Sequence, residues 1–172
     1  GGEDPARAGR GYLLLTARQA AVDTAACALR AARLRPVAVE PEPAVLIRLA
    51  RLLAAPGGEA VEVLVDLGAG GTRLVVARAD ALLLFRELPV GGSHLTAALA
   101  ERRQVTLAEA EELKCIEYQE AGSLADFGPA GERLVRELER SLRYVERQHR
   151  LEGYASLHLV GGGARWPLLR RE

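Results

Sequence analysis

The sequence has no methionine, only two cysteines, and no excess of charge of either sign. Its 23 Lys and Arg residues balance 23 Asp and Glu residues, which argues against a basic nucleic-acid-binding surface, so we expect no nucleic-acid partner. Cys27 and Cys115 lie far apart, and neither belongs to a CxxC motif. We therefore expect buried free thiols in a reducing compartment, with a disulfide as the alternative.

Long apolar runs are also missing. No stretch approaches the eighteen or so residues that a membrane-spanning helix needs, and the chain does not open with a signal peptide. We therefore expect a cytoplasmic protein without direct membrane insertion. The content of 49% hydrophobic and 27% charged residues is typical of a globular fold. Because the chain has no initiator methionine and stops three residues after "WPLL", we expect it to be part of a larger protein.

Strand and helix signals alternate along the first third of the chain. Thr16 and Gln19 have the spacing of a capping box, which predicts the start of an Ala-rich helix, and Pro36 marks its end. The elements expected in this part are a loose tail over 1–11, a strand over 12–15, a helix to about 33, a strand over 37–40 and a helix over 41–54.

The rest of the chain predicts a hairpin meander followed by helices. Ser93 and Thr106 are expected to cap helices, and Glu109 completes a second capping box with Thr106. The expected strands are 61–66, 73–78, 81–88 and 156–160, and the expected helices are 93–102, 107–118 and 131–150. The last helix should carry the exposed ion pairs Glu132–Arg136, Glu139–Arg143 and Glu146–Arg150. This order predicts an α/β or α+β fold with a central sheet.

A glycine-rich turn, "DLGAGGT", joins two of the predicted strands. Gly68, Gly70 and Gly71 allow backbone N–H groups to approach an anion, with Asp66 at the start of the turn and Thr72 at its end. A dinucleotide fingerprint or a P-loop is excluded, because a strand follows the turn and no Gly-Lys-Ser/Thr is present. Two interpretations stay open: a simple hairpin turn, or a loop that grips phosphate while Asp66 meets a metal-bound water.

Two further segments could contribute to the same site. The predicted strand 156–160 runs into Gly161, Gly162 and Gly163, which allow close approach of a flat ligand or of another backbone. Glu111 and Lys114 share a helix face and could together hydrogen-bond a ribose or an adenine. Taken singly, the first segment is better explained by a tight turn, and the second by a solvent-exposed ion pair.

In combination, these segments resemble the actin-like nucleotide-binding superfamily, which includes actin, DnaK, sugar kinases and FtsA. The second phosphate loop of that superfamily has the form D-[IL]-G-x-x-x-T, matched by Asp66, Gly68 and Thr72. Its adenosine loop is a strand followed by glycines, matched by 161–163. The resemblance implies a partial actin-like, ribonuclease H-like fold, with ATP and Mg²⁺ as ligands.

Within the superfamily, the chain is most similar to the PilM family of type IV pilus assembly over about residues 12–169. The A-E-x-x-K helix of the FtsA and MreB branch, which flanks the adenosine, is matched by Ala110, Glu111 and Lys114. The segments "DLGAGGTRLVV" and "LHLVGGGARWPLL" follow the PilM pattern in order. At position 73, where relatives often carry Asp or Asn, this chain has Arg73, a cation that could aid anion binding but removes a possible metal ligand.

The resemblance also implies a domain plan. Residues 1–11 are a flexible tail, 12–56 are the remainder of the first lobe, and 57–172 are most of the second lobe, with a helical subdomain at about 93–125. The family's first phosphate loop is missing, so we expect this chain alone to bind ATP weakly or not at all.

For the parent protein, the resemblance implies a nucleotide-responsive scaffold with weak or no ATPase activity. Its implied partners are the cytoplasmic N-terminal tail of a bitopic inner-membrane pilus protein (PilN in that family) and the pilus motor ATPase platform. It would lie in the cytoplasm, peripheral to the inner membrane through its partner. The segments 12–15 and 17–33 are what the chain keeps of the docking groove, although core packing is the stronger explanation for any single residue in them. The alternatives are an FtsA-like cell-division filament protein and a small-molecule (sugar) kinase.

Overall fold

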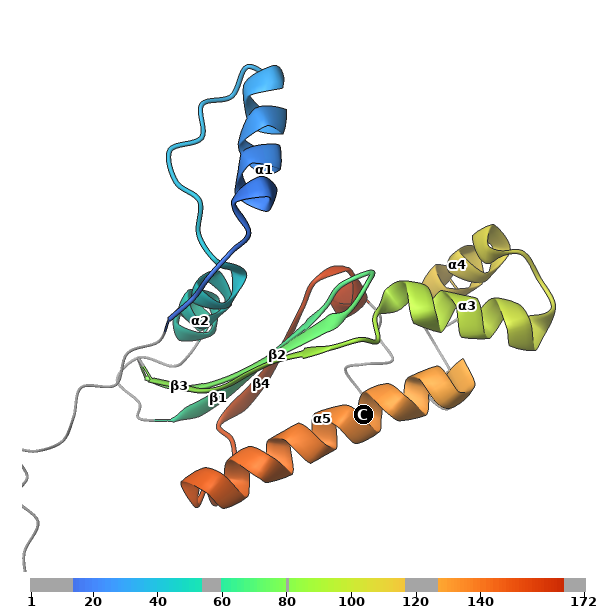
Figure 1. Cartoon of the computed structure of the whole chain (residues 1–172). Helices are drawn as coiled ribbons and strands as arrows, with labels where there is room; N and C mark the ends of the chain where they lie inside the picture. The colour runs from blue at the N-terminus through green and yellow to red at the C-terminus, as the bar shows by residue number, and fades with distance from the viewer. Residues whose placement is uncertain (1–13, 54–59, 80, 117–126, 166–172) are drawn as a thin grey trace, which may run out of the picture. The chain divides into compact units, whose positions relative to one another are not determined.

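The computed structural model describes residues 14–53, 60–79, 81–116 and 127–165. The chain divides into two compact units, Gly1–Val45 and Leu46–Glu172. The first unit contains helix α1 (Gln19–Ala31) and the start of α2 (Glu42–Leu53) (Figure 1). The lobe boundaries expected from the sequence stay a prediction.

Several sequence expectations for the first unit are wrong. Helix α1 is preceded by Arg18 and not by a Thr16 cap, because the Gln19 side chain donates instead to Asp23 Oδ1 at 2.9 Å. Residues 37–40 are not a strand; Val37 is 92% exposed, and no strand among the described residues pairs with this segment. Leu14 and Leu15 are likewise outside any strand, and the rest of that predicted strand lies outside the described residues.

The second unit is built on a four-stranded sheet with the order β3-β2-β1-β4. Strands β1 and β2 pair antiparallel, as do β2 and β3, whereas β1 and β4 are parallel. The strand bounds are Val61–Leu67 (β1), Thr72–Arg78 (β2), Ala81–Leu88 (β3) and Ser156–Val160 (β4). The meander predicted from the sequence is therefore confirmed, together with the final strand.

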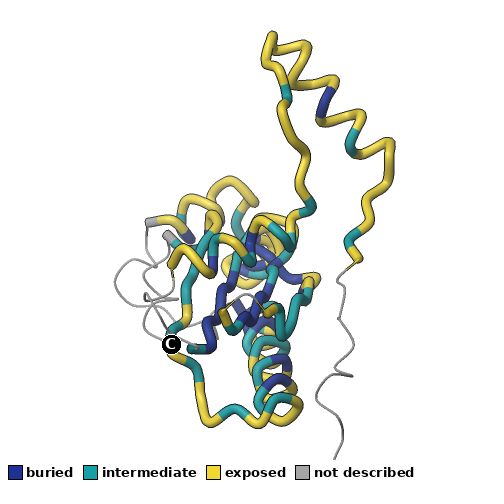
Figure 2. Tube along the Cα trace, turned by 90° about the vertical axis from the view of Figure 1, so that its left-hand side faces the viewer, coloured by how far each residue is buried: buried dark blue, intermediate teal, exposed yellow. Residues whose placement is uncertain are grey.

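Both faces of the sheet are covered, which explains why β1 is apolar almost throughout. On one face, Leu46 and Ala50 of α2 pack with Leu64 and Val75. On the other face, Val145 of α5 (Gly128–His149) packs with alternate residues of β1 and β2. Figure 2 shows the buried positions concentrated in the strands. The sheet is therefore a rigid base for the turn that joins β1 to β2.

Helices α3 (Gly92–Arg103) and α4 (Leu107–Ile116) follow the meander and pack at the turn end of the sheet. The Thr106 capping box is confirmed: the Thr106 N–H donates to Glu109 Oε2 at 2.8 Å, and the Glu109 N–H donates back to Thr106 Oγ1 at 3.3 Å. The Ser93 cap is wrong, because α3 begins one residue earlier, after Gly91.

Helix α5 begins at Gly128, earlier than expected, and carries two of its three predicted ion pairs. Arg136 pairs with Glu132 at 3.0 Å, and Arg143 pairs with Glu139 at 3.1 Å. The Glu146–Arg150 pair does not form, because Arg150 leaves the helix with a left-handed φ of 50°. No helix in the described ranges is long and apolar enough to cross a membrane.

Candidate functional site

The β1–β2 turn is held in shape by its own backbone and by the segment that precedes α3. The Gly68 N–H donates to the Gly71 carbonyl at 3.0 Å. The Gly68 and Ala69 carbonyls accept the N–H groups of Gly92 and Ser93, each at 2.9 Å. Within the described part of the chain, the amides of Ala69 and Gly70 make no hydrogen bond to another backbone group. Two adjacent N–H groups are therefore available to an anion, as the phosphate-loop interpretation requires.

The start of α3 can approach this turn only because Gly91 has no side chain. A Cβ atom at Gly91 would collide with the Gly71 amide and lie 2.6 Å from the Gly68 carbonyl oxygen. The glycine at position 91 is the sequence signal of this contact, because the two backbones leave no room for a side chain there.

A polar network joins α4 to the first turn of α3. The buried ammonium of Lys114, whose side chain is 4% exposed, donates to Glu111 Oε2 at 2.5 Å and to Thr96 Oγ1 at 2.7 Å. It also lies 3.4 Å from the Gly92 carbonyl oxygen. The Thr96 hydroxyl is 2.5 Å from Glu111 Oε2. Lys114 is therefore not the solvent-exposed member of a surface pair, and Thr96, which no sequence motif singles out, positions both charged groups.

The network fixes the charge of Glu111. Partial burial alone would raise the pKa of Glu111, but the hydrogen bonds from Lys114 and Thr96 and the positive charge of Lys114 outweigh that effect, so the pKa is lowered. The carboxylate is therefore ionised at neutral pH. Its second oxygen, Oε1, lies 3.8 Å from the Cys115 sulfur, on the side that faces the cavity described below.

The three glycines after β4 have different surroundings. Gly161 has a φ of 82°, and a Cβ atom there would collide with Asp66 Oδ1 and lie 2.8 Å from the Leu67 carbonyl oxygen. A Cβ atom at Gly163 would lie 2.8 Å from the Leu67 Cβ. At Gly162 a Cβ atom would meet nothing within 4 Å. The fold therefore requires glycine at positions 161 and 163, whereas the space beside Gly162 is open.

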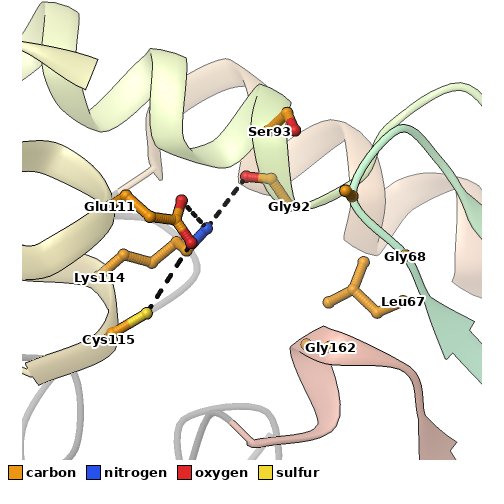
Figure 3. Close-up of a pocket in the computed structure, with 10 residues that line it drawn as sticks. Leu67, Gly68, Gly92, Ser93, Glu111, Lys114, Cys115 and Gly162 are labelled. Atoms are coloured by element: carbon orange, nitrogen blue, oxygen red, sulfur yellow. Dashed lines mark hydrogen bonds and ion pairs between the residues drawn. The ribbon is translucent and has the colours of Figure 1, made fainter. Parts of the chain in front are cut away.

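These segments enclose a cavity of about 560 Å³. Figure 3 shows Glu111 and Lys114 reaching from α4 toward the start of α3, with Gly162 on the opposite side of the cavity. The lining residues come from four regions distant in sequence: Leu67, Gly68, Ala69, Gly92, Ser93, Glu111, Lys114, Cys115, Gly162 and Gly163. Five of the residues selected from the sequence therefore meet at one cavity.

The other selected residues lie nearby but do not line it. Gly70, Gly71 and Thr72 line a second cavity of about 480 Å³, together with Arg73. The Thr72 hydroxyl is fully buried and donates to the Val90 carbonyl at 2.6 Å, so this hydroxyl stabilises the fold through a hydrogen bond. Asp66 pairs with Arg73, whose Nη1 lies 3.2 Å from Asp66 Oδ2.

The expectation of buried cysteines is wrong. Cys27 and Cys115 are both exposed free thiols. Cys27 lies on α1, where Ala26 is the buried residue. Cys115 lies in the last turn of α4, at the edge of the cavity of about 560 Å³. The apolar residues around each cysteine in the sequence did not indicate whether that cysteine lies on the buried or on the exposed face of its helix.

The sheet order, the glycine turn and the glycine loop after β4 together define the chain as part of an actin-like protein. Solved structures with this fold include the ethanolamine utilization protein EutJ from Carboxydothermus hydrogenoformans, with a TM-score of 0.57 and 22% identity over 81% of this chain and 47% of that one. MreB5 of Spiroplasma citri bound to AMPPNP matches with a TM-score of 0.52 and 14% identity over 84% of this chain and 54% of that one.

The family follows from the sequence match. The profile of the family described as type IV pilus assembly protein PilM matches residues 3–172, and the chain belongs to that family. A solved PilM-PilN type IV pilus biogenesis complex matches with a TM-score of 0.63 and 32% identity, over 87% of this chain and 43% of that one. The chain thus spans about half the length, or less, of the first relatives it matches. No curated protein matches it in sequence.

Proposed function

We propose that the second unit provides one side of an ATP-binding site in an actin-like scaffold of type IV pilus assembly. The observation that carries the proposal is the convergence of three remote segments, "DLGAGGT", "AEELK" and "VGGG", on one cavity of about 560 Å³. That volume lies within the roughly 300–1,000 Å³ typical of ligand pockets.

The two ends of the cavity suit the two ends of a nucleotide. Glu111 and Lys114 offer an ionised carboxylate and an ammonium group, which can bond ribose hydroxyls or polar edges of a base. Gly162 presents bare backbone against which a flat ring can lie. The amides of Ala69, which lines this cavity, and of Gly70, which lines the neighbouring cavity of about 480 Å³, suit a phosphate. A nucleoside phosphate therefore has a complementary group along its whole length.

Relatives with the same fold support a nucleotide as the ligand. The archaeal actin homolog Ta0583 has been solved in complex with ADP, with a TM-score of 0.51, 18% identity and coverage of 76% of this chain and 47% of that one. MreB5 is bound to AMPPNP. We propose ATP for this chain, with slow or absent turnover, because the described residues around the cavity include no carboxylate other than Glu111.

The partner that we propose is the cytoplasmic tail of an inner-membrane pilus protein. The solved PilM-PilN complex shows that a 32% identical relative assembles with PilN. The first unit offers an apolar surface for such a tail, because Leu29, Leu34 and Val39 are exposed. Through this partner the protein would lie at the inner membrane and join the pilus motor ATPase platform.

The test of the nucleotide site is a pair of matched glycine substitutions. Gly162→Val places a branched side chain into the cavity, whereas Gly153→Val adds the same side chain at a position where a Cβ atom also meets nothing within 4 Å but which lies outside the cavity lining. Calorimetry on the full-length gene product should show ATP affinity reduced about tenfold or more in Gly162→Val and unchanged in Gly153→Val. Equal affinity in both variants and the wild type would contradict the proposed site.

The partner is tested separately. The N-terminal tails of the inner-membrane pilus proteins encoded by neighbouring genes are immobilised, and capture of the full-length gene product is measured with and without ATP. We expect capture by one tail. Failure of every tail under both conditions would contradict the proposed scaffold role without affecting the nucleotide site.

A further inference from the structure

The sequence feature that the proposed function leaves unexplained is a cation beside the glycine turn. Asp66 and Arg73 are register partners at the end of the β1–β2 ladder, and Arg73 Nη1 lies 3.2 Å from Asp66 Oδ2. Their side chains are 16% and 30% exposed, so the pair is only partly solvated. The one acidic residue of the "DLGAGGT" turn is therefore neutralised by a guanidinium from the facing strand.

Arg73 also lies against the turn itself. A Cβ atom at Gly68 would be 3.4 Å from Arg73 Nη1, so the guanidinium passes directly beside the turn. Farther from the turn, Arg73 Nε lies 3.9 Å from Glu87 Oε1, on the largely exposed side chain of Glu87. Asp66 and Glu87 thus hold the guanidinium from two sides and fix its position.

Residues of the turn line both cavities. Gly68 and Ala69 line the one that contains Glu111 and Lys114, whereas the turn residues after them line the one that contains Arg73. A nucleotide whose base and ribose lie beside Glu111 would extend its phosphates toward the turn. The planar guanidinium of Arg73 has a geometry that suits phosphate oxygens.

The residues present do not fit the Mg²⁺ ion expected from the fold family. Magnesium sites combine one or two carboxylates with water and substrate phosphates in a strict octahedral arrangement. Asp66 Oδ2 is bonded to Arg73, and Oδ1 is covered by the backbone of Gly161 so closely that a Cβ there would collide with it. Within the described ranges, no group of three His, Cys, Asp or Glu residues could hold a metal. A divalent cation at Asp66 would also be repelled by the guanidinium.

We propose that Arg73 takes the place of a divalent cation, so that this protein binds its nucleotide as the metal-free phosphate anion. The inference rests on the proposed nucleotide site and specifies its chemistry. Arg73 supplies the positive charge, the Ala69 and Gly70 amides supply neutral donors, and Asp66 holds the guanidinium at the turn. The ligand class is a nucleoside di- or triphosphate without bound metal.

The experiment measures ATP affinity of the full-length gene product by calorimetry, once with Mg²⁺ and once with excess EDTA. We expect affinity in EDTA to be at least as high as in Mg²⁺. Arg73→Ala should reduce the metal-free affinity about 10- to 100-fold, which is the usual effect of losing a charged hydrogen bond. Arg78→Ala is the matched control, because Arg78 lies on the same strand at the end away from the turn, paired with Val61, and should bind like the wild type.

The outcomes separate this inference from the proposed function. Binding that disappears in EDTA, or an Arg73→Ala variant with wild-type affinity, would overturn the role of Arg73 while the nucleotide site stands. No binding by the wild type under either condition would overturn both. If Arg73→Ala does not fold, Arg73→Lys, which keeps the charge but loses the planar fork, and the wild-type comparison in EDTA still decide the question.

Discussion

Replacement of Gly161 by alanine should destabilise the protein much more than the same replacement at its neighbour Gly162. Two costs combine at this position. An L-residue in the left-handed region, where Gly161 has a φ of 82°, costs about 1–2 kcal/mol. The new Cβ would also collide with Asp66 Oδ1 and lie 2.8 Å from the Leu67 carbonyl oxygen, and such overpacking costs about 1–3 kcal/mol.

The collision cannot be relieved cheaply. Asp66 is held by Arg73 at 3.2 Å, and the Leu67 carbonyl belongs to β1, which is bonded to strands on both sides. We therefore expect both costs to remain, for a total of about 2–5 kcal/mol. For a domain of this size or somewhat larger, that corresponds to a fall in Tm of at least about 4 °C.

The assay is thermal unfolding followed by circular dichroism, with Gly162→Ala as the neighbouring control. A Cβ atom at Gly162 meets nothing within 4 Å, so this variant should unfold within about 0.5 kcal/mol of the wild type. Equal Tm values for Gly161→Ala and Gly162→Ala would refute the argument, because they would mean that the close approach of the loop to Asp66 imposes no cost.

Three further predictions test the surroundings of the site. Thr72→Val leaves the buried Val90 carbonyl without its 2.6 Å hydrogen bond and should lower the free energy of unfolding, measured in urea, by about 1–3 kcal/mol. Thr24→Val, on the exposed side of α1, should change that free energy by less than about 0.5 kcal/mol. Equal effects of the two substitutions would contradict the structural role of the Thr72 hydroxyl. ATP should slow maleimide labelling of Cys115, which borders the cavity, but not of Cys27, and equal protection of both thiols would contradict the site. Because the pKa of Glu111 is lowered below 4.5, its network stabilises the fold above that pH and is lost as the pH falls further; the stability difference between wild type and Glu111→Gln should therefore shrink below pH 4.5, and a constant difference would contradict it.

Local signals in the sequence predicted the second unit well. The β1–β2–β3 meander follows from β-forming residues interrupted by glycines, and the Thr106 capping box needs only residues three apart. The same kind of signal failed at 37–40, where β-forming residues found no strand to pair with. It failed also at Thr16, because Gln19 had a competing partner in Asp23. A local pattern decides the structure only where the surrounding fold offers no stronger partner.

The candidate site was predictable in its parts but not in its connections. The glycine turn, the glycine loop and the Glu111–Lys114 pair each have a recognisable spacing. The role of Thr96 does not, because it depends on how α3 packs against α4, and a single threonine within a helix carries no signal of its own. The pairing of Asp66 with Arg73 depends on the strand register across the turn, which the sequence alone left open.

The first turn of α3 has a consequence for how the site would respond to a ligand. Amides at the start of a helix ordinarily lack a partner within the helix and exchange their protons readily. In α3, the amides of Gly92 and Ser93 donate to the carbonyls of Gly68 and Ala69. The turn thus supplies the hydrogen-bond acceptors that the first amides of the helix would otherwise lack. Any displacement of the turn must then lengthen these two bonds or carry α3 along with it. The hydrogen bond between Thr96 and Lys114 would transmit that displacement to α4, so the turn and the two helices should move together.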